Sequence, residues 1–285
     1  MEFLIVQILN GLVFGILLFL SAAGLTLVLG VMDIINLAHG SFYIFGGYIG
    51  FSIAKHTHSF LLGCLGGLLV ASLLGLFIYR VILQQGFARD VLAQVLIAFG
   101  ILLVFTDVCR WIWGGIPLLI SKPEILQGSI NLGNIVYPKY RLAVIVIGAM
   151  VFGFLWWFQE RTKYGAIVRA GVDDEKMTQA IGINIAIVKT LVFGLGALLA
   201  GFAGVIGAPF IGLYTGLDMD ILLLALVVII IGGMGSLWGA LVGALFIGLV
   251  DSFGKSLLPE LSVFTIFAAM VIVLAIKPSG LFGSE

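Results

Sequence analysis

Charged residues are scarce in this sequence: they make up only 10% of its 285 residues, while 62% are hydrophobic. Soluble domains carry about 25% charged residues, which they need to cover an apolar interior. The scarcity of charge excludes an ordinary soluble protein. It indicates an all-α, polytopic transmembrane helix bundle that uses membrane lipid as its solvent.

Net charge and paired cysteines are also lacking. The formal net charge is zero, so there is no electrostatic argument for nucleic acid as a partner. The two cysteines, Cys64 and Cys109, both lie in apolar runs, which is typical of buried free thiols.

Motifs for catalysis and for nucleotide binding are absent as well. No G-x-x-x-x-G-K-[ST] sequence occurs, so the chain cannot bind ATP in the P-loop manner. H-E-x-x-H, C-x-x-C and G-x-S-x-G are missing too. We therefore expect no enzymatic activity, no metal and no cofactor in this chain.

Long apolar runs fill most of the sequence. A spanning helix needs roughly 20 apolar residues, and about eight segments meet this need, two of them interrupted. We expect a single transmembrane domain over residues 1–285. The candidate spans are 3–22, 24–31 with 36–54, 60–82, 91–113, 141–158, 189–212, 221–231 with 236–250, and 260–277.

The first interruption, residues 33–41, places polar side chains between two apolar runs. Asn36, His39 and Ser41 lie there together with Asp33. Such residues at membrane depth must be buried in protein or line a wet cavity. A simpler reading is a turn in which Asn36 caps the next helix and His39 makes a structural hydrogen bond.

The second interruption, residues 232–236, is rich in glycine. It contains Gly232, Gly233, Gly235 and Ser236, and each glycine weakens a helix by about 1 kcal/mol relative to alanine. Paired interruptions in the two halves of a transporter indicate a substrate pathway near the midplane. We therefore expect both interruptions to face the interior of the bundle, although tight helix packing explains the glycines equally well.

One segment, residues 160–189, is charged and is named here the charged segment. The positive-inside rule places it in the cytoplasm by a margin of one basic residue over 114–140. Asp173 is a good N-cap and Gly182 a good C′ residue, which predicts a helix over about 174–181. Met177, Ala180 and Ile181 form one apolar face of that helix. A helix of two turns is too short to be stable alone, so this face must pack on its own protein or on a partner.

Several blocks resemble the bacterial ABC permeases of the branched-chain amino acid class. GLTLVLGVMDIINLAHGSFYIFGGY (24–48) is similar to their N-terminal signature, and RTKYGAIVRAGVDDEKMTQAIGIN (161–184) is similar to their coupling loop. Further similarity occurs at 194–206, 231–248 and 277–283. The resemblance covers the chain from end to end.

This resemblance implies a permease of the bacterial inner membrane that is driven by ATPase subunits. It also implies a second permease subunit, identical or related, and an extracytoplasmic substrate-binding protein. The charged segment would dock on the ATPase. The coupling residues implied are Arg161, Gly165, Arg169, Ala170, Met177, Ala180, Ile181 and Gly182.

Two places depart from the family pattern, and they weaken the inference from family to substrate. Asp33 stands where many relatives have a basic residue, and KPSGLFG (277–283) replaces the usual Arg-Pro start. We expect branched-chain or other small hydrophobic amino acids. The family also includes importers of urea, short amides and other small carboxylates.

Two further classes of transport protein remain open. In an ion-coupled secondary transporter, Asp33, His39 or Asp107 would carry protons. A passive channel is disfavoured, since it would leave the charged segment without a task. Asp218 and Asp220 fall in an expected loop and receive no role.

Overall fold

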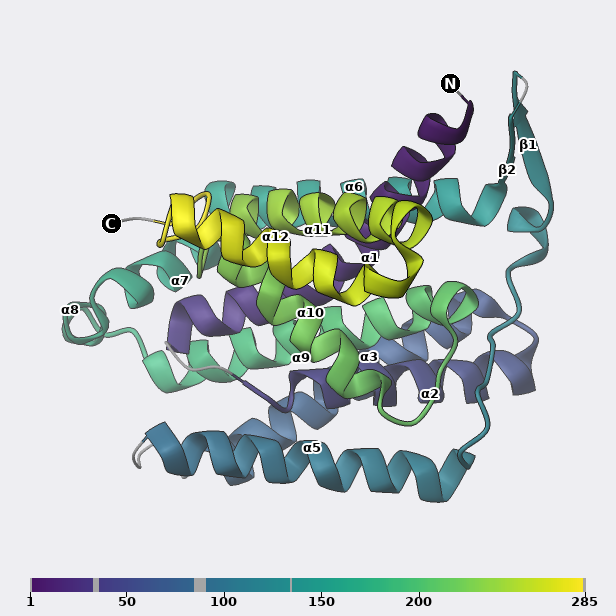
Figure 1. The fold of residues 1–285 in the computed structure, drawn as a ribbon. Helices are drawn as coiled ribbons and strands as arrows, with labels where there is room; N and C mark the ends of the chain where they lie inside the picture. Colours follow the sequence, from purple (N-terminus) through teal and green to yellow (C-terminus); the bar gives the residue numbers. More distant parts are fainter. Residues whose placement is uncertain (1, 33–35, 85–90, 134, 284–285) are drawn as a thin grey trace.

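The computed structural model describes residues 2–32, 36–84, 91–133 and 135–283, and these form a helical bundle (Figure 1). Among the described residues, seven helical segments are long and apolar enough to cross a membrane. The expected all-α transmembrane bundle is confirmed. The main helices are α1 (Glu2–Met32), α2 (His39–Thr57), α3 (Phe60–Ile78), α5 (Val91–Trp113), α6 (Lys139–Arg161), α7 (Lys163–Asp173), α8 (Glu175–Ala180), α9 (Ile185–Ile211), α10 (Leu217–Gly232), α11 (Leu237–Leu257) and α12 (Ser262–Ile276).

Short elements complete the chain. A π-helical turn, η1 (Tyr79–Leu83), extends α3, and 3-10 turns occur at η2 (Glu124–Leu126) and η3 (Pro259–Leu261). Strands β1 (Ser129–Leu132) and β2 (Ile135–Pro138) pair antiparallel. This hairpin and the N-terminus lie at one end of the bundle, whereas α7, α8 and the C-terminus lie at the other (Figure 1). We call these the hairpin end and the charged end.

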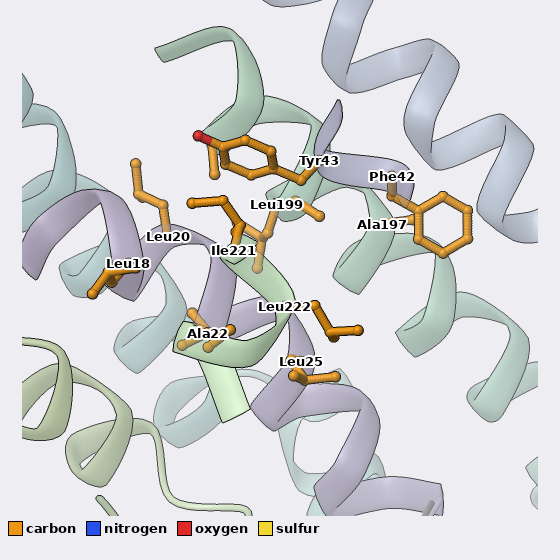
Figure 2. Packing of buried hydrophobic residues seen from close by; sticks show 14 of the residues in the cluster. Leu18, Leu20, Ala22, Leu25, Phe42, Tyr43, Ala197, Leu199, Ile221 and Leu222 are labelled. Atoms are coloured by element: carbon orange, nitrogen blue, oxygen red, sulfur yellow. The ribbon is translucent and has the colours of Figure 1, made fainter. Parts of the chain in front are cut away.

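The centre of the bundle is formed by α1, α2, α9 and α10. In the most apolar window of α1, 89% of the residues are buried, compared with 6% in the window that contains α12. Figure 2 shows side chains from the four central helices packed together, including Leu25, Phe42, Leu199 and Leu222. Lipid has no hydrophobic effect to drive these helices together, so close packing must do so.

Small residues permit the central crossings. A Cβ built on Gly46 of α2 would collide with the Cα of Gly201 on α9, because the two backbones touch there. Such contacts replace side-chain interdigitation with direct backbone contact.

The first interruption differs in form from the expected broken span. Residues 24–31 continue α1 without a break, and α2 is a separate helix. The ring Nε2 of His39, at the start of α2, lies 3.0 Å from the carbonyl oxygen of Ser21. The start of α2 therefore lies beside Ser21, eleven residues before the end of α1 at Met32. Asp33 lies outside the described residues.

The second interruption is a tight turn between two antiparallel helices, and not a break within one span. Gly233 and Gly235 have φ values of 102° and 78°, which reverse the chain between α10 and α11. The C-terminal segment then completes this turn: the N–H groups of Leu281 and Phe282 donate to the carbonyls of Ile231 and Gly232, at 2.7 and 2.9 Å. The last carbonyls of α10 thus find donors that the helix itself cannot provide.

The glycine contact predicts a sharp contrast between two substitutions. Gly46→Ala should lower the free energy of unfolding by about 1–3 kcal/mol, because the new methyl group overpacks the crossing with α9. Gly153→Ala in α6 is the matched control, since nothing lies within 4 Å of the added Cβ. It should be neutral or stabilising by up to about 1 kcal/mol. Thermal unfolding of the two variants in detergent measures the difference, and equal stability would contradict the packing argument.

Candidate functional site

The charged segment forms two short helices in succession, α7 and α8, where the sequence predicted one. Thr162 caps α7, since its Oγ1 accepts a hydrogen bond from the N–H of Gly165 at 3.0 Å. Asp174 caps α8 in the same way, accepting from the N–H of Met177 at 2.9 Å. The predicted cap, Asp173, was wrong by one residue: it ends α7. The helix predicted over 174–181 spans Glu175–Ala180.

The end of α8 agrees with the prediction. Gly182 has a φ of 90° and follows the C-cap residue Ile181, so it is the C′ residue. Its N–H donates to the carbonyl of Gln179, and that of Ile183 donates to Thr178. This pair of bonds is the Schellman motif.

Side chains hold α8 firmly to the rest of the protein. The hydroxyl of Thr178, which is buried, donates to the carbonyl of Ala170 on α7 at 2.9 Å. Lys189 on α9 and Glu175 form an ion pair at 2.8 Å. The predicted apolar face points away from these attachments: Met177 is 64% exposed and Ile181 68%. Ala180 is exposed as well. The face does not pack on its own protein.

The remaining coupling residues lie where α6 turns into α7. A Cβ on Gly165 would collide with the carbonyls of Phe158 and Gln159, so glycine lets α7 fold back on α6. Arg169 pairs with Glu160 across this turn, at 3.6 Å. Arg161 is exposed at the last turn of α6, where the helix dipole favours a positive charge.

A cavity of about 470 Å³ lies between the charged segment and the turn at residues 232–236, which we call the glycine turn. Trp156 and Arg169 line one side of it, and Gly235 and Ser236 line the other. The residues of the second interruption therefore lie at the charged end. Gly232 and Gly233 are buried there, Gly235 is exposed, and Ser236 caps α11 by accepting from the N–H of Gly239.

The residues of the first interruption lie deeper in the bundle and are buried. Asn36 and His39 are each 1% exposed, and Ser41 is 0% exposed. The Oδ1 atom of Asn36 accepts from the N–H of Ala38 at 3.1 Å, just ahead of α2. The structure does not bring this group together with the glycine turn.

The start of α10 lies beside the first interruption instead. A Cβ on Gly40 would collide with the carbonyl oxygen of Asp218, so the first turns of α2 and α10 touch. Sequence reasoning had placed Asp218 and Asp220 in a loop, whereas they begin α10 after Gly216. The missed signal was a glycine followed by two acids ahead of a long apolar run, which is typical of a helix N-terminus.

Comparison with known proteins places this chain in a family. A family model described as branched-chain amino acid transport system / permease component matches residues 7–276. The high-affinity branched-chain amino acid transport system permease proteins BraD of Pseudomonas aeruginosa and LivH of Salmonella typhimurium are 27% and 28% identical to the chain. Each match covers 97% of this chain, with 95% of BraD and 94% of LivH.

Two further similarities, to a sugar permease and to a solved structure, extend the comparison. The ribose import permease protein RbsC of Haemophilus influenzae is 28% identical, over 93% of this chain and 82% of RbsC. The solved structure of PsaBC from Streptococcus pneumoniae in complex with Fab has a TM-score of 0.54 and 13% identity, covering 96% of this chain and 92% of that one. The second likeness concerns the fold alone.

The cap of α8 yields a prediction about local stability. Asp174→Ala removes the acceptor for the N–H of Met177, which costs about 1 kcal/mol. Amide hydrogen exchange over residues 177–180 should therefore speed up by about 5-fold. Lys176→Ala on the same helix is the control, since Lys176 is exposed and its replacement leaves the cap in place. Equal exchange in the two variants would show that Asp174 does not hold this helix.

Proposed function

The chain belongs to the branched-chain amino acid transport system permease family, and on that premise we propose that it forms the transmembrane pathway for branched-chain or other small hydrophobic amino acids. It is a permease subunit of an ABC importer, and its relatives are named as transport permeases. The amino acid substrate is supported by BraD and LivH, which match nearly their full lengths. Relatives that import ribose and arabinose keep sugars among the alternatives, beside urea, short amides and small carboxylates.

The observation that carries the coupling role is the exposed apolar face of α8. Met177 and Ile181 lie on a capped helix that is fixed to α7 and α9 by Thr178 and Glu175. Two large apolar side chains presented to water on a fixed support are typical of an anchor that enters a groove on a partner protein. Since the chain has no phosphate-binding loop, the partner that we propose is the ATPase subunit.

The attachments of α8 to α7 and α9 would transmit a movement of the docked ATPase to the helix bundle. A push on α8 acts on α9 through the Lys189–Glu175 ion pair and on α7 through the hydrogen bond from Thr178 to the carbonyl of Ala170. Arg169 of α7 also lines the cavity that adjoins the glycine turn at the end of α10. We propose that Arg161, Gly165, Arg169 and Ala170 keep α6 and α7 in register during this motion.

The pathway is proposed to run beside the first turn of α2, where Asn36, His39 and Ser41 are buried. The glycine turn, with Gly232, Gly233, Gly235 and Ser236, would act at the charged end as the place where α10 and α11 pivot. The family implies ATPase and substrate-binding partners. We further propose a second permease subunit and a location in the bacterial inner membrane with the charged end in the cytoplasm.

Docking through α8 is tested by the double substitution Met177→Asp with Ile181→Asp. Uptake should fall to background and the ATPase should no longer co-purify, because two carboxylates cannot enter an apolar groove without heavy desolvation. Lys176→Asp is the control: it changes the charge of the segment by the same amount on another face and should retain most uptake. Membrane levels of both variants are measured, and normal uptake by the double variant would refute the docking role.

The substrate and the energy source are tested together in vesicles that contain the complete importer. We expect ATP-dependent accumulation of labelled leucine that excess isoleucine and valine suppress, while ribose and urea do not. An uncoupler at constant ATP should leave uptake unchanged. Uptake that collapses with the uncoupler would favour the ion-coupled transporter, and suppression by ribose or urea would move the substrate to another class.

A further inference from the structure

Asp218 is a buried acidic side chain that the coupling scheme does not use. It lies in the first turn of α10 and is 1% exposed. Its Oδ2 atom accepts a hydrogen bond from the hydroxyl of Thr106 on α5. Its Oδ1 atom has no hydrogen-bond partner among the described residues. Buried polar atoms nearly always have hydrogen-bond partners, so the unpartnered Oδ1 atom of Asp218 requires an explanation.

The contacts of Asp218 place it beside the interior part of α1 and away from the helix ends. Its carbonyl adjoins Gly40, and the neighbouring His39 contacts the carbonyl of Ser21 in the middle of α1. From Ser21 to the end of α1 at Met32, the helix rises ~16 Å. The hydrocarbon core of a bilayer is ~30 Å thick, so a junction ~16 Å from the end of α1 is deep enough to lie within that core.

Other unsatisfied groups lie at the same junction. The Oγ atom of Ser41 and the Nδ1 atom of His39, both in the first turn of α2, have no partners in the described part of the chain. The unpartnered hydroxyl of Ser41 can donate to a carboxylate, and the free carboxyl oxygen of Asp218 suits a cation.

Within the described ranges of the chain, no basic side chain forms an ion pair with Asp218. The ion pairs formed by the described residues involve Glu160, Glu175 and Asp251, all far along the chain from Asp218. Ionisable side chains at membrane depth usually mark a substrate or ion pathway, since lipid cannot solvate them. The first turn of a helix is also a favourable place for the negative charge of a carboxylate.

We propose that Asp218 binds the ammonium group of the transported amino acid at this junction. Thr106 positions the carboxyl group, and the unpartnered hydroxyl of Ser41 donates to the substrate carboxylate. Leu222, one turn beyond Asp218 and part of the cluster in Figure 2, provides an apolar wall for the substrate side chain. The inference rests on the proposed function, because it requires an amino acid substrate.

The present conformation closes this site. Asp218 is buried, and the backbone of α10 lies directly against Gly40. Gly40 brings no side chain to this contact, whereas α10 presents the carbonyl of Asp218 and the side chain of Leu222 to it. Binding of the ammonium group therefore accompanies the opening of the α2–α10 contact.

The test is competition binding of labelled leucine to the purified permease–ATPase complex in lipid nanodiscs. The competitors are leucine and 4-methylpentanoate, which is leucine without its amino group. In the unaltered complex leucine should compete at least about 10-fold better, as expected for a charged hydrogen bond. In Asp218→Asn this advantage should fall below about 3-fold. Asp220→Asn is the matched control, because Asp220 is an exposed acid two residues away, bonded to Tyr214.

Each outcome is decisive. A variant that is merely misfolded loses binding capacity for both competitors but keeps their ratio, so an unchanged ratio in Asp218→Asn overturns the proposal. Where that variant does not assemble, Thr106→Val replaces it. This variant should reduce the advantage of leucine over 4-methylpentanoate by about 3-fold. An unchanged advantage again overturns the proposal. An unaltered complex that binds no leucine and accumulates none would overturn the amino acid substrate itself, which is a separate result.

Discussion

Backbone polar groups at membrane depth must find hydrogen bonds within the protein, and this constraint decides where this chain can leave a helix. At the end of α10, the carbonyls of Ile231 and Gly232 are satisfied by Leu281 and Phe282, fifty residues later in the sequence. Ahead of α2, the side chain of Asn36 receives the N–H of Ala38. The interruptions are polar or rich in glycine because only such residues provide these bonds or allow another backbone to come close.

The same constraint explains which parts of the fold could be predicted from the sequence. Composition and long apolar runs were sufficient for an all-α transmembrane bundle. They were not sufficient for the geometry of the interruptions. Gly24 lies within α1 at a cost of about 1 kcal/mol. Its backbone contact with Gly196 of α9 compensates for that cost, and a contact so distant in the sequence cannot be read from local propensity.

In the candidate site, local rules were reliable for the end of α8 and ambiguous for its beginning. Gly182 ends the helix because it alone in that turn readily adopts a positive φ. Asp173 and Asp174 are equally good caps, and the choice between them depends on where α7 ends. That in turn depends on Thr162 and Gly165, which allow α7 to form against α6. Tyr164, Ile167 and Val168 have helical spacing and were the available signal for α7.

Helix α10 connects the two regions for which a role in transport is proposed. Its last turn is fixed by the C-terminal segment and lies near the cavity that Arg169 lines, while its first turn holds Asp218 against Gly40. Helix α10 has 16 residues and is therefore ~24 Å long, and we treat it as one rigid element in the proposed coupling. A displacement at the glycine turn must therefore appear at Asp218 as well. The helix begins at the depth of the proposed ammonium site and ends beside the charged segment, so no intermediate chain of side-chain shifts is needed to link coupling to the pathway.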